Sequence, residues 1–374
     1  MIRWRSGTVT QLRREWPGAA EIIVTVDGAL VRALAYPALV GSPRIGDRVL
    51  LNTTALSLGL GTGGYAFVVA IPDRLPPDGE LPGHIVKSRY TPLQATVASA
   101  DEQGSPYHDV LRDADSVEGM PVVVADLHSA LPAILAGLLS AGSFRVAYVM
   151  QDGGALPAWF SRTVAGLRSA GWLAACVSTG QSFGGDLEAV TVHSGLLAAR
   201  HVLGADVAVV TQGPGNLGTG TRWGFSGVAA GEAVNAVGVL GGRAVGSLRV
   251  SSADSRSRHH GVSHHSLTAY GRVALAACDI VVPALPEPLG SAVAASAAVL
   301  GERHRLVTVP VDGLLEALRD CPVGLSTMGR GLDEDLAYFL AAAAAGRHAA
   351  TLLAPGGQST RMRGYPPPIP PGPR

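Results

Sequence analysis

The sequence predicts a doubly wound α/β fold with a mostly parallel sheet, preceded by a small all-β barrel. Beyond residue 121, short apolar runs alternate with helical runs in units of roughly 25 to 35 residues, a pattern typical of repeated βαβ units. In the first 72 residues, by contrast, short β-prone runs are separated only by turn signals such as Asp27-Gly28. These two patterns predict two kinds of sheet in one chain.

Residues 1–72 are expected to form the barrel. Five short strands with tight turns favour a barrel of the SH3 or oligonucleotide-binding kind. Such barrels often bind nucleic acid, but this segment lacks a clear face of aromatic and basic residues, so a structural or docking role is preferred. The expected strands are Gly7–Gln11, Glu21–Val26, Ala29–Ala35, Arg48–Asn52 and Tyr65–Ile71.

We expect a linker and connecting segment over residues 73–120, the α/β domain over 121–355 and a flexible proline-rich tail over 356–374. Continuous apolar strands indicate a sheet covered on both faces. The expected strands are Val122–Ala125, Val146–Met150, Leu173–Ser178, Val207–Thr211, Ala244–Val250, Ile280–Val282 and Leu306–Val309. The expected helices are Ala130–Leu139, Pro157–Ser169, Leu187–Leu203, Val228–Leu240, Leu267–Ala277, Gly290–Val299, Gly313–Arg319 and Asp333–Leu353.

Charge and cysteine content narrow the functional class. Lys+Arg and Asp+Glu both number 29 in 374 residues, which argues against a general binder of nucleic acid or membrane surfaces. The 3 cysteines are far apart, and there is neither a signal-peptide core nor a long apolar span. We therefore expect a cytoplasmic protein with no membrane contact, no nucleic-acid partner and a small-molecule ligand; a homo-oligomer is an alternative use of its surface.

Polar loops follow the predicted parallel strands, and the carboxyl ends of such strands share one edge of the sheet. The candidate catalytic residues in these loops are Asp126, His128, Asp152, His259, His264 and His265. The candidate ligand-binding residues are Gln181, Gln212, Gly213, Gly215, Asn216, Gly218, Thr219, Thr221, Arg256 and Arg258. We expect one shared site, although loops are polar for other reasons too.

The glycine-rich loop 213–221 matches two nucleotide motifs poorly. Gly213, Gly215 and Gly218 give G-x-G-x-x-G after a strand, but the next helix begins too late to meet a pyrophosphate. Thr221 stands where a phosphate-binding loop needs lysine. The loop is therefore interpreted as a run of backbone N–H groups that wraps an anion, or as a tight turn.

The segment 254–265 holds four histidines within seven positions, and its role stays open among three alternatives. A divalent metal is a candidate cofactor, with His259, His264, Asp152 and Asp254 as candidate ligands. An anion or acid-base site would use Arg256 and Arg258. The third alternative is an exposed basic loop in which Ser263 caps the next helix.

Several motifs together resemble the uncharacterised bacterial domain-of-unknown-function family 3866. The resemblance rests on residues 46–54, 60–64, 84–94, 152–157, 180–186, 212–227 and 258–265, and it covers nearly the whole chain except the proline-rich tail. The family implies a bacterial cytoplasmic setting and no activity, cofactor or catalytic residue.

The leading functional hypothesis is an enzyme, a hydrolase or group transferase acting on a small polar or anionic substrate at the strand ends. One alternative is a regulatory module that binds a nucleotide or metabolite without chemistry. Another is a scaffold whose loops build an oligomer interface.

Overall fold

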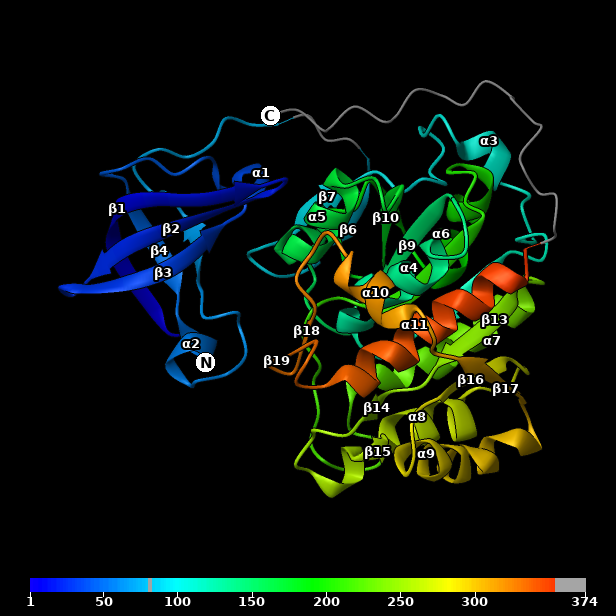
Figure 1. Ribbon diagram of the computed structural model, residues 1–374. Helices are drawn as coiled ribbons and strands as arrows, with labels where there is room; N and C mark the ends of the chain where they lie inside the picture. The colour runs from blue at the N-terminus through cyan, green and yellow to red at the C-terminus, as the bar shows by residue number, and fades with distance from the viewer. Residues whose placement is uncertain (80–82, 354–374) are drawn as a thin grey trace.

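The computed structural model describes residues 1–79 and 83–353; the predicted tail (356–374) lies outside the described residues. It contains a closed barrel followed by an α/β body, which Figure 1 shows side by side. The predicted fold class is therefore confirmed.

The barrel consists of β1 (Trp4–Trp16), β2 (Ala19–Val26), β3 (Ala29–Ala35), β4 (Arg48–Asn52) and β5 (Ala66–Ala70), with short helices α1 (Pro37–Val40) and α2 (Thr54–Ser57). The strands close in the order β1-β2-β3-β5-β4, β4 pairs back to β1, and β3 runs parallel to β5. This order is that of the oligonucleotide-binding barrel. Residues such as Val24 and Leu51 are fully buried inside it.

Aromatic side chains join the barrel to the α/β body. The indole N–H of Trp16 donates to the carbonyl oxygen of Trp159 at 2.7 Å, and the ring of Tyr36 lies 6.1 Å from that of Trp159. Gly18 in the β1–β2 turn has φ +85°, and a Cβ there would overlap the Trp159 ring. Oligonucleotide-binding barrels use this turn in recognition. In this chain the turn contacts the neighbouring domain instead.

In the described residues, the α/β body is built on a sheet of eight parallel strands in the order β11-β10-β9-β12-β8-β13-β16-β17. Their bounds are β8 (Pro121–Val124), β9 (Val146–Gln151), β10 (Ala175–Thr179), β11 (Leu187–Ala189), β12 (Val207–Gln212), β13 (Arg243–Ser247), β16 (Asp279–Ala284) and β17 (Arg305–Pro310). The central strands are fully buried, as their continuous apolar runs predict.

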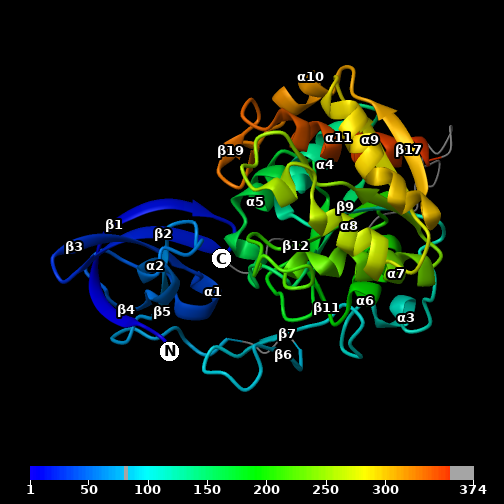
Figure 2. The ribbon, with the colours of Figure 1, turned by 90° about the horizontal axis from the view of Figure 1, so that it is seen from below.

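Helices cover both faces of this sheet. On one face, α11 (Leu336–Thr351) packs on α4 (Leu131–Leu139) and α10 (Leu314–Arg319); on the other, α6 (Val192–His201) packs on α7 (Ala229–Val239) (Figure 2). Gly137 and Gly346 allow α4 and α11 to approach closely, because a Cβ on either would overlap a carbonyl of the other helix. The remaining helices are α3 (His108–Leu111), α5 (Arg162–Ser169), α8 (His264–Thr268) and α9 (Leu289–Ala297).

The structure differs from the predicted elements in several places. The start of the predicted helix 187–203 is strand β11, and the helix begins at Val192 behind a Thr191–Ser194 capping box. The linker contains a hairpin of β6 (Ile85–Lys87) and β7 (Ala95–Val97). The predicted strand 244–250 ends at Ser247, and Val250–Ser251 forms β14, which pairs with β15 (Gly261–Val262). A second small hairpin joins β18 (Ser326–Thr327) to β19 (Arg330–Gly331).

No helix within residues 1–79 and 83–353 combines the length and the apolar character needed to cross a membrane.

Candidate functional site

The strand order creates a switch point at β8. From β8 the chain crosses to β9, on one side of β8 in the sheet. The two neighbours of β8 are β12 and β13, and from each of them the chain crosses to a strand on the other side, β13 and β16 respectively. Loops that diverge in this way open a crevice at the carboxyl ends of the strands, where ligands bind in open α/β sheets. Asp126, Gln212 and Arg249 lie at or just beyond the ends of these three strands.

These three side chains are buried and adjacent. Gln212 donates its amide N–H to the Asp126 carbonyl oxygen at 2.8 Å. The guanidinium of Arg249 lies 3.9 Å from the Asp126 carboxylate and is 4% exposed. Burial of a carboxylate and a guanidinium at the ends of these strands costs free energy unless the two groups pair with each other or with a ligand.

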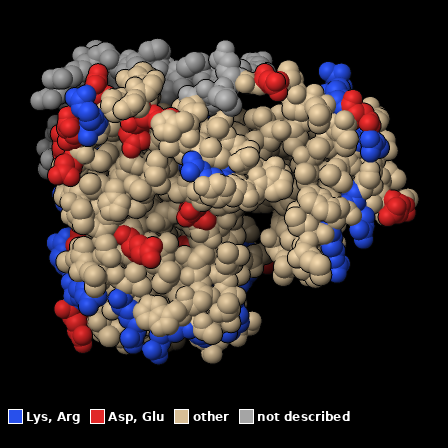
Figure 3. Space-filling model, turned by 180° about the vertical axis from the view of Figure 1, so that it is seen from behind, with Lys and Arg blue, Asp and Glu red and all other residues tan. Residues whose placement is uncertain are grey.

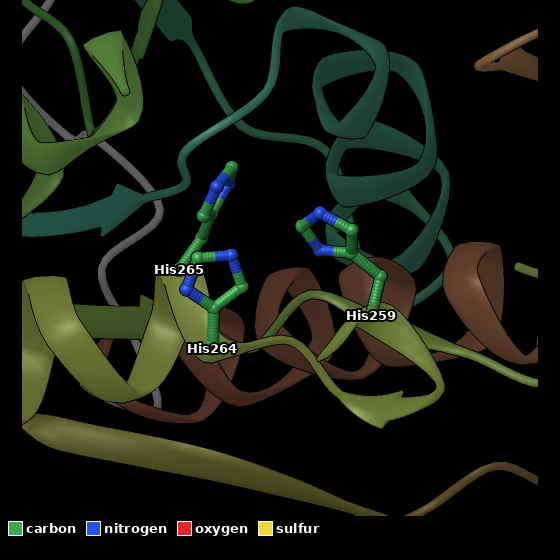
Figure 4. Close-up of side chains that lie close together, drawn as sticks. All are labelled: His259, His264 and His265. Atoms are coloured by element: carbon green, nitrogen blue, oxygen red, sulfur yellow. The ribbon is translucent and has the colours of Figure 1, made fainter. Parts of the chain in front are cut away.

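Three histidines converge beside this group. His259 comes from the short helix η4 (Ser257–His259), whereas His264 and His265 begin α8, and one ligand atom from each lies within 4.8 Å of the others. In Figure 4 the three rings face a common space. We call them the histidine cluster. The β14–β15 hairpin brings the two segments together. Ser263 caps α8 by accepting the His265 N–H, a contact that belongs to the third of the three alternatives for this segment.

Neighbouring groups hold two of the rings. Nδ1 of His259 lies 2.7 Å from the Ser263 hydroxyl. Nδ1 of His265 faces Arg249 at 3.3 Å and the Asp126 carboxylate at 3.7 Å, and its ring stacks on Phe225. His259 and His265 are buried, so the interpretation of this segment as an exposed basic loop is wrong for them.

Three polar atoms of the site lack hydrogen-bond partners. Among the described residues, Nε2 of His264, Oδ2 of Asp126 and Oε1 of Gln212 are buried and have no such partner. A buried polar atom without a partner costs about 1 to 3 kcal/mol. Three such atoms at one place favour a site that a ligand completes.

Two histidines of the cluster, His259 and His264, are held in the neutral form. Burial, followed by the charges of Arg249 and Arg256, lowers the pKa of His259 to about 3. Burial and the neighbouring His265 also lower the pKa of His264. Neutral imidazoles accept protons and ligate metals, whereas imidazolium does neither.

An arginine-lined hollow adjoins the histidine cluster. It has a volume of about 450 Å³ and is lined by Gly220, Arg222, Arg258, His264, Leu267, Thr268 and Arg272. His264 belongs to both the cluster and the hollow. Figure 3 shows basic side chains gathered along the lower edge of the body, at the level where Figure 1 places α8.

The arginines of this region fall into two groups. Arg256 binds the Asp254 carboxylate through two hydrogen bonds, and this pairing strongly lowers the Asp254 pKa. Arg249 and Arg330 lie 3.8 and 3.6 Å from the same carboxylate. The Asp254 carboxylate is therefore paired with arginines and is not a metal ligand here. Arg256 in turn is paired with Asp254. Among the described residues, no ion pair involves Arg222, Arg258 or Arg272.

The glycine-rich loop is a folded turn rather than an open cradle. The N–H groups of Gly213 and Thr219 donate to the carbonyl oxygens of Gln151 and Gly224. The hydroxyls of Thr219 and Thr221 hydrogen-bond to each other at 3.0 Å. These groups are not free to wrap an anion, and the loop reaches the hollow through Gly220 and Arg222 instead. Gly215 and Gly218 make no contact with the hollow.

Asn216 of the glycine-rich loop contacts the buried polar group. Its Oδ1 accepts from Gln212 at 3.2 Å and from the Ser226 hydroxyl at 2.8 Å. It thereby ties the glycine-rich loop to the end of β12.

His128 is an internal residue. Nδ1 bonds to the Tyr148 hydroxyl at 3.0 Å and Nε2 to the Ser161 hydroxyl at 2.8 Å, so both ring nitrogens are occupied. Burial lowers its pKa to about 4. Ser161 also caps α5, and this arrangement assigns His128 to packing of the interior rather than to the histidine cluster.

Asp152 and Gln181 lie in a separate group, beyond β9 and β10. Asp152 accepts the Gln181 N–H at 2.9 Å, and Gln181 accepts the Ser88 N–H at 2.9 Å. The chain's only lysine, Lys87, is buried here; it donates to the Gly180 carbonyl at 2.6 Å and lies 3.6 Å from Glu188. Asp152 is therefore not among the groups that contact the histidines.

Sequence reasoning missed Arg222, Phe225, Arg249 and Arg272. Arg249 lies within a predicted strand and Arg272 within a predicted helix, so neither belongs to the predicted loops that hold the candidate residues. A lone arginine in an otherwise apolar strand was the available signal, because arginine is rarely buried without a partner.

The family of proteins of unknown function DUF3866 matches this chain over residues 32–346. The chain belongs to this family. The DUF3866 match begins within β3 of the barrel and spans the whole site described above, including the histidine cluster and the hollow. A comparison with curated proteins finds no match.

Proposed function

We propose that this DUF3866 protein is an enzyme that hydrolyses a small anionic substrate, or transfers a group from it, at the histidine cluster. The observation that carries this proposal is the position of His264, which lines the hollow and also belongs to the cluster. A substrate held in the hollow would therefore present its reacting bond to the imidazoles.

The hollow suits a small anion. Its volume of about 450 Å³ falls within the range of about 300 to 1,000 Å³ that is usual for small-molecule sites. Arg222, Arg258 and Arg272 supply guanidinium groups, which bind phosphate and carboxylate oxygens in pairs. Because Asp254 already neutralises Arg256, the positive charge that faces a ligand comes from the hollow itself.

The cluster supplies the chemistry. In hydrolysis, water attacks the electrophilic phosphorus or carbonyl carbon, the bond to the leaving group breaks, and a proton leaves the water. A neutral imidazole takes that proton directly, or holds a metal ion that acidifies the water. The Asp126 carboxylate lies 3.7 Å from Nδ1 of His265, where it would stabilise positive charge that develops on the ring.

A cytoplasmic location forms part of the proposal. The three cysteines, all within the described residues, are free thiols, as is usual in a reducing compartment.

The test measures turnover by the full chain on phosphate monoesters, phosphodiesters and carboxylic esters. Proton release reports the turnover. We expect His264→Gln to abolish turnover, whereas His193→Gln, an exposed position on α6, leaves it unchanged. Arg258→Gln should raise KM roughly 10- to 100-fold, because a charge-assisted hydrogen bond is worth about 1.5 to 3 kcal/mol. Arg13→Gln on the exposed barrel surface is its control.

Anion binding without turnover on any substrate class would contradict the enzyme proposal. That result would favour the alternative, a regulatory module that senses a metabolite. Equal turnover by His264→Gln and the native chain would remove the cluster from the chemistry.

A further inference from the structure

The histidine cluster has the composition of a metal site. His259, His264 and His265 each offer an imidazole nitrogen, and these atoms lie within 4.8 Å of one another. Zinc at about 2.0 to 2.1 Å from three nitrogens requires nitrogen separations of about 3.3 Å, so binding draws the rings slightly together. The rings stand on two short segments, with His259 at the end of η4 and His264 and His265 in the first turn of α8.

The neighbours of the rings bear on which nitrogen can bind a metal. Nδ1 of His259 is engaged by Ser263, which leaves Nε2 of that ring available. Nδ1 of His265 accepts from the Arg249 guanidinium at 3.3 Å, because arginine can only donate, so ligation through Nε2 of His265 requires the ring proton to move to Nδ1, on the side of the Asp126 carboxylate 3.7 Å away. In His264 it is also Nε2 that, among residues 1–79 and 83–353, is buried without a hydrogen-bond partner.

The surroundings match those of metal-binding histidines. Such histidines usually contact a carboxylate, hydroxyl or carbonyl through their second nitrogen, which fixes the ring and its tautomer. Ser263 makes this contact with His259 at 2.7 Å, whereas the Asp126 carboxylate lies 3.7 Å from Nδ1 of His265, and both residues are at least nine-tenths buried. The otherwise unpartnered Oδ2 of Asp126 is the oxygen nearest to His265.

Charge in the next layer is balanced. Arg249, Arg256 and Arg330 are matched by Asp126, Asp254 and Asp335. A divalent ion on three neutral imidazoles would keep its full charge, which an anion in the neighbouring hollow would offset.

We infer that His259, His264 and His265 bind one divalent transition-metal ion of the zinc class and leave a fourth position for water or a substrate anion. Three protein ligands with one open position are typical of catalytic rather than structural zinc. Metal binding stands on this geometry alone, whereas its catalytic role rests on the proposed function.

The experiment measures metal binding by the full chain. The protein is stripped with a chelator and titrated calorimetrically with Zn²⁺; Co²⁺ is then added, because its visible absorption reports coordination geometry. We expect one ion per chain and a tetrahedral cobalt spectrum. His259→Gln and His264→Gln should each weaken Zn²⁺ affinity by more than about 100-fold, and Asp126→Asn by roughly 10- to 100-fold.

His260→Gln is the matched control, since His260 lies in the same segment but is exposed and outside the cluster. Its affinity for Zn²⁺ should equal that of the native chain. Circular dichroism and thermal melting show whether each variant is folded, and a variant that unfolds is replaced by the corresponding Asn substitution.

Absence of stoichiometric binding, or equal binding by native protein, His259→Gln and His264→Gln, would overturn the inference. Metal binding without turnover would leave the metal site standing while the proposed function fails. Turnover by the chain after chelation would support the proposed function and contradict a catalytic role of the metal.

Discussion

The imidazole of His265 lies parallel to the phenyl ring of Phe225, with ring centroids 3.7 Å apart and planes inclined by 2°. Phe225 belongs to the loop after β12, whereas His265 belongs to α8, which follows β13. The stack therefore joins two loops of the switch point and holds His265 where it faces Asp126 at 3.7 Å.

Replacing Phe225 with Leu should weaken Zn²⁺ binding by roughly 10-fold, because the ring of His265 loses its support. The free energy of unfolding should fall by only about 1 kcal/mol more than the loss of buried apolar area alone would cause. Calorimetric titration and urea unfolding measure the two effects. Trp223→Leu in the same loop is the control, since Trp223 is exposed. Unchanged affinity in Phe225→Leu would show that the stack does not position His265.

Acid should destabilise the protein through His128. Its folded pKa is about 4 and its ordinary value is 6.5, so the unfolded chain takes up this proton first as the pH falls. Neutral His128 contributes about 3 kcal/mol to the free energy of unfolding. This contribution is complete above about pH 6.5 and is lost as the pH falls through about 4.

His128→Asn should therefore lose less stability than the native chain between pH 7 and 4.5, as urea unfolding at each pH would show. His193→Asn, at an exposed position, should keep the native slope. Identical slopes for all three proteins would exclude His128 as the source.

Lys87 should stabilise the protein more at pH 8 than at pH 5. Burial raises the pKa of Glu188 to about 7, and the Lys87 ammonium 3.6 Å away compensates its charge. Stability associated with protonated Glu188 is complete below its ordinary pKa of 4.5 and is lost as the pH rises through about 7.

Lys87→Met should therefore cost about 3 to 5 kcal/mol at pH 8, where the buried carboxylate loses its cation, and less at pH 5. The Lys87→Met/Glu188→Gln double variant should recover part of this loss. Denaturant unfolding at both pH values measures the effect. An equal loss at both pH values, with purely additive single effects, would contradict the coupling.

Close packing of α4 on α11 should make Gly346 intolerant of a methyl group. A Cβ there would overlap the Ile134 carbonyl oxygen, so Gly346→Ala should destabilise the protein by about 1 to 3 kcal/mol or more. An ordinary helical position would gain up to about 1 kcal/mol from the same change. Gly324→Ala is the control, because a Cβ at Gly324 meets open space. A native melting temperature for Gly346→Ala would contradict the packing.

The fold was predictable because its signals are local. The apolar runs of β8, β9 and β12 and the turn at Asp27-Gly28 are legible in the sequence, and the structure confirms them. Strand β11 was missed because its three residues directly precede a longer helical run. Burial of Glu188 against Lys87 depends on the β6–β7 hairpin, which is a tertiary arrangement.

The candidate site was predictable in part. The strand-end rule brings Asp126, Gln212 and the histidine segment to one place, but it does not say how far along the edge a loop lies. Neighbouring strands are about 4.8 Å apart, so an edge eight strands long holds more than one group. Asp152 follows β9 and contacts Gln181, whereas Asp126 follows β8 and faces His265.

Anomalous X-ray diffraction from crystals of the full chain grown with Zn²⁺ and inorganic phosphate would show directly whether the histidine cluster holds a metal beside an anion. We expect one strong zinc peak at about 2.0 to 2.1 Å from imidazole nitrogens of His259, His264 and His265, with phosphate held by Arg258 in the adjoining hollow. Zinc only at exposed histidines such as His260 or His193, with an empty cluster and no anion in the hollow, would contradict it.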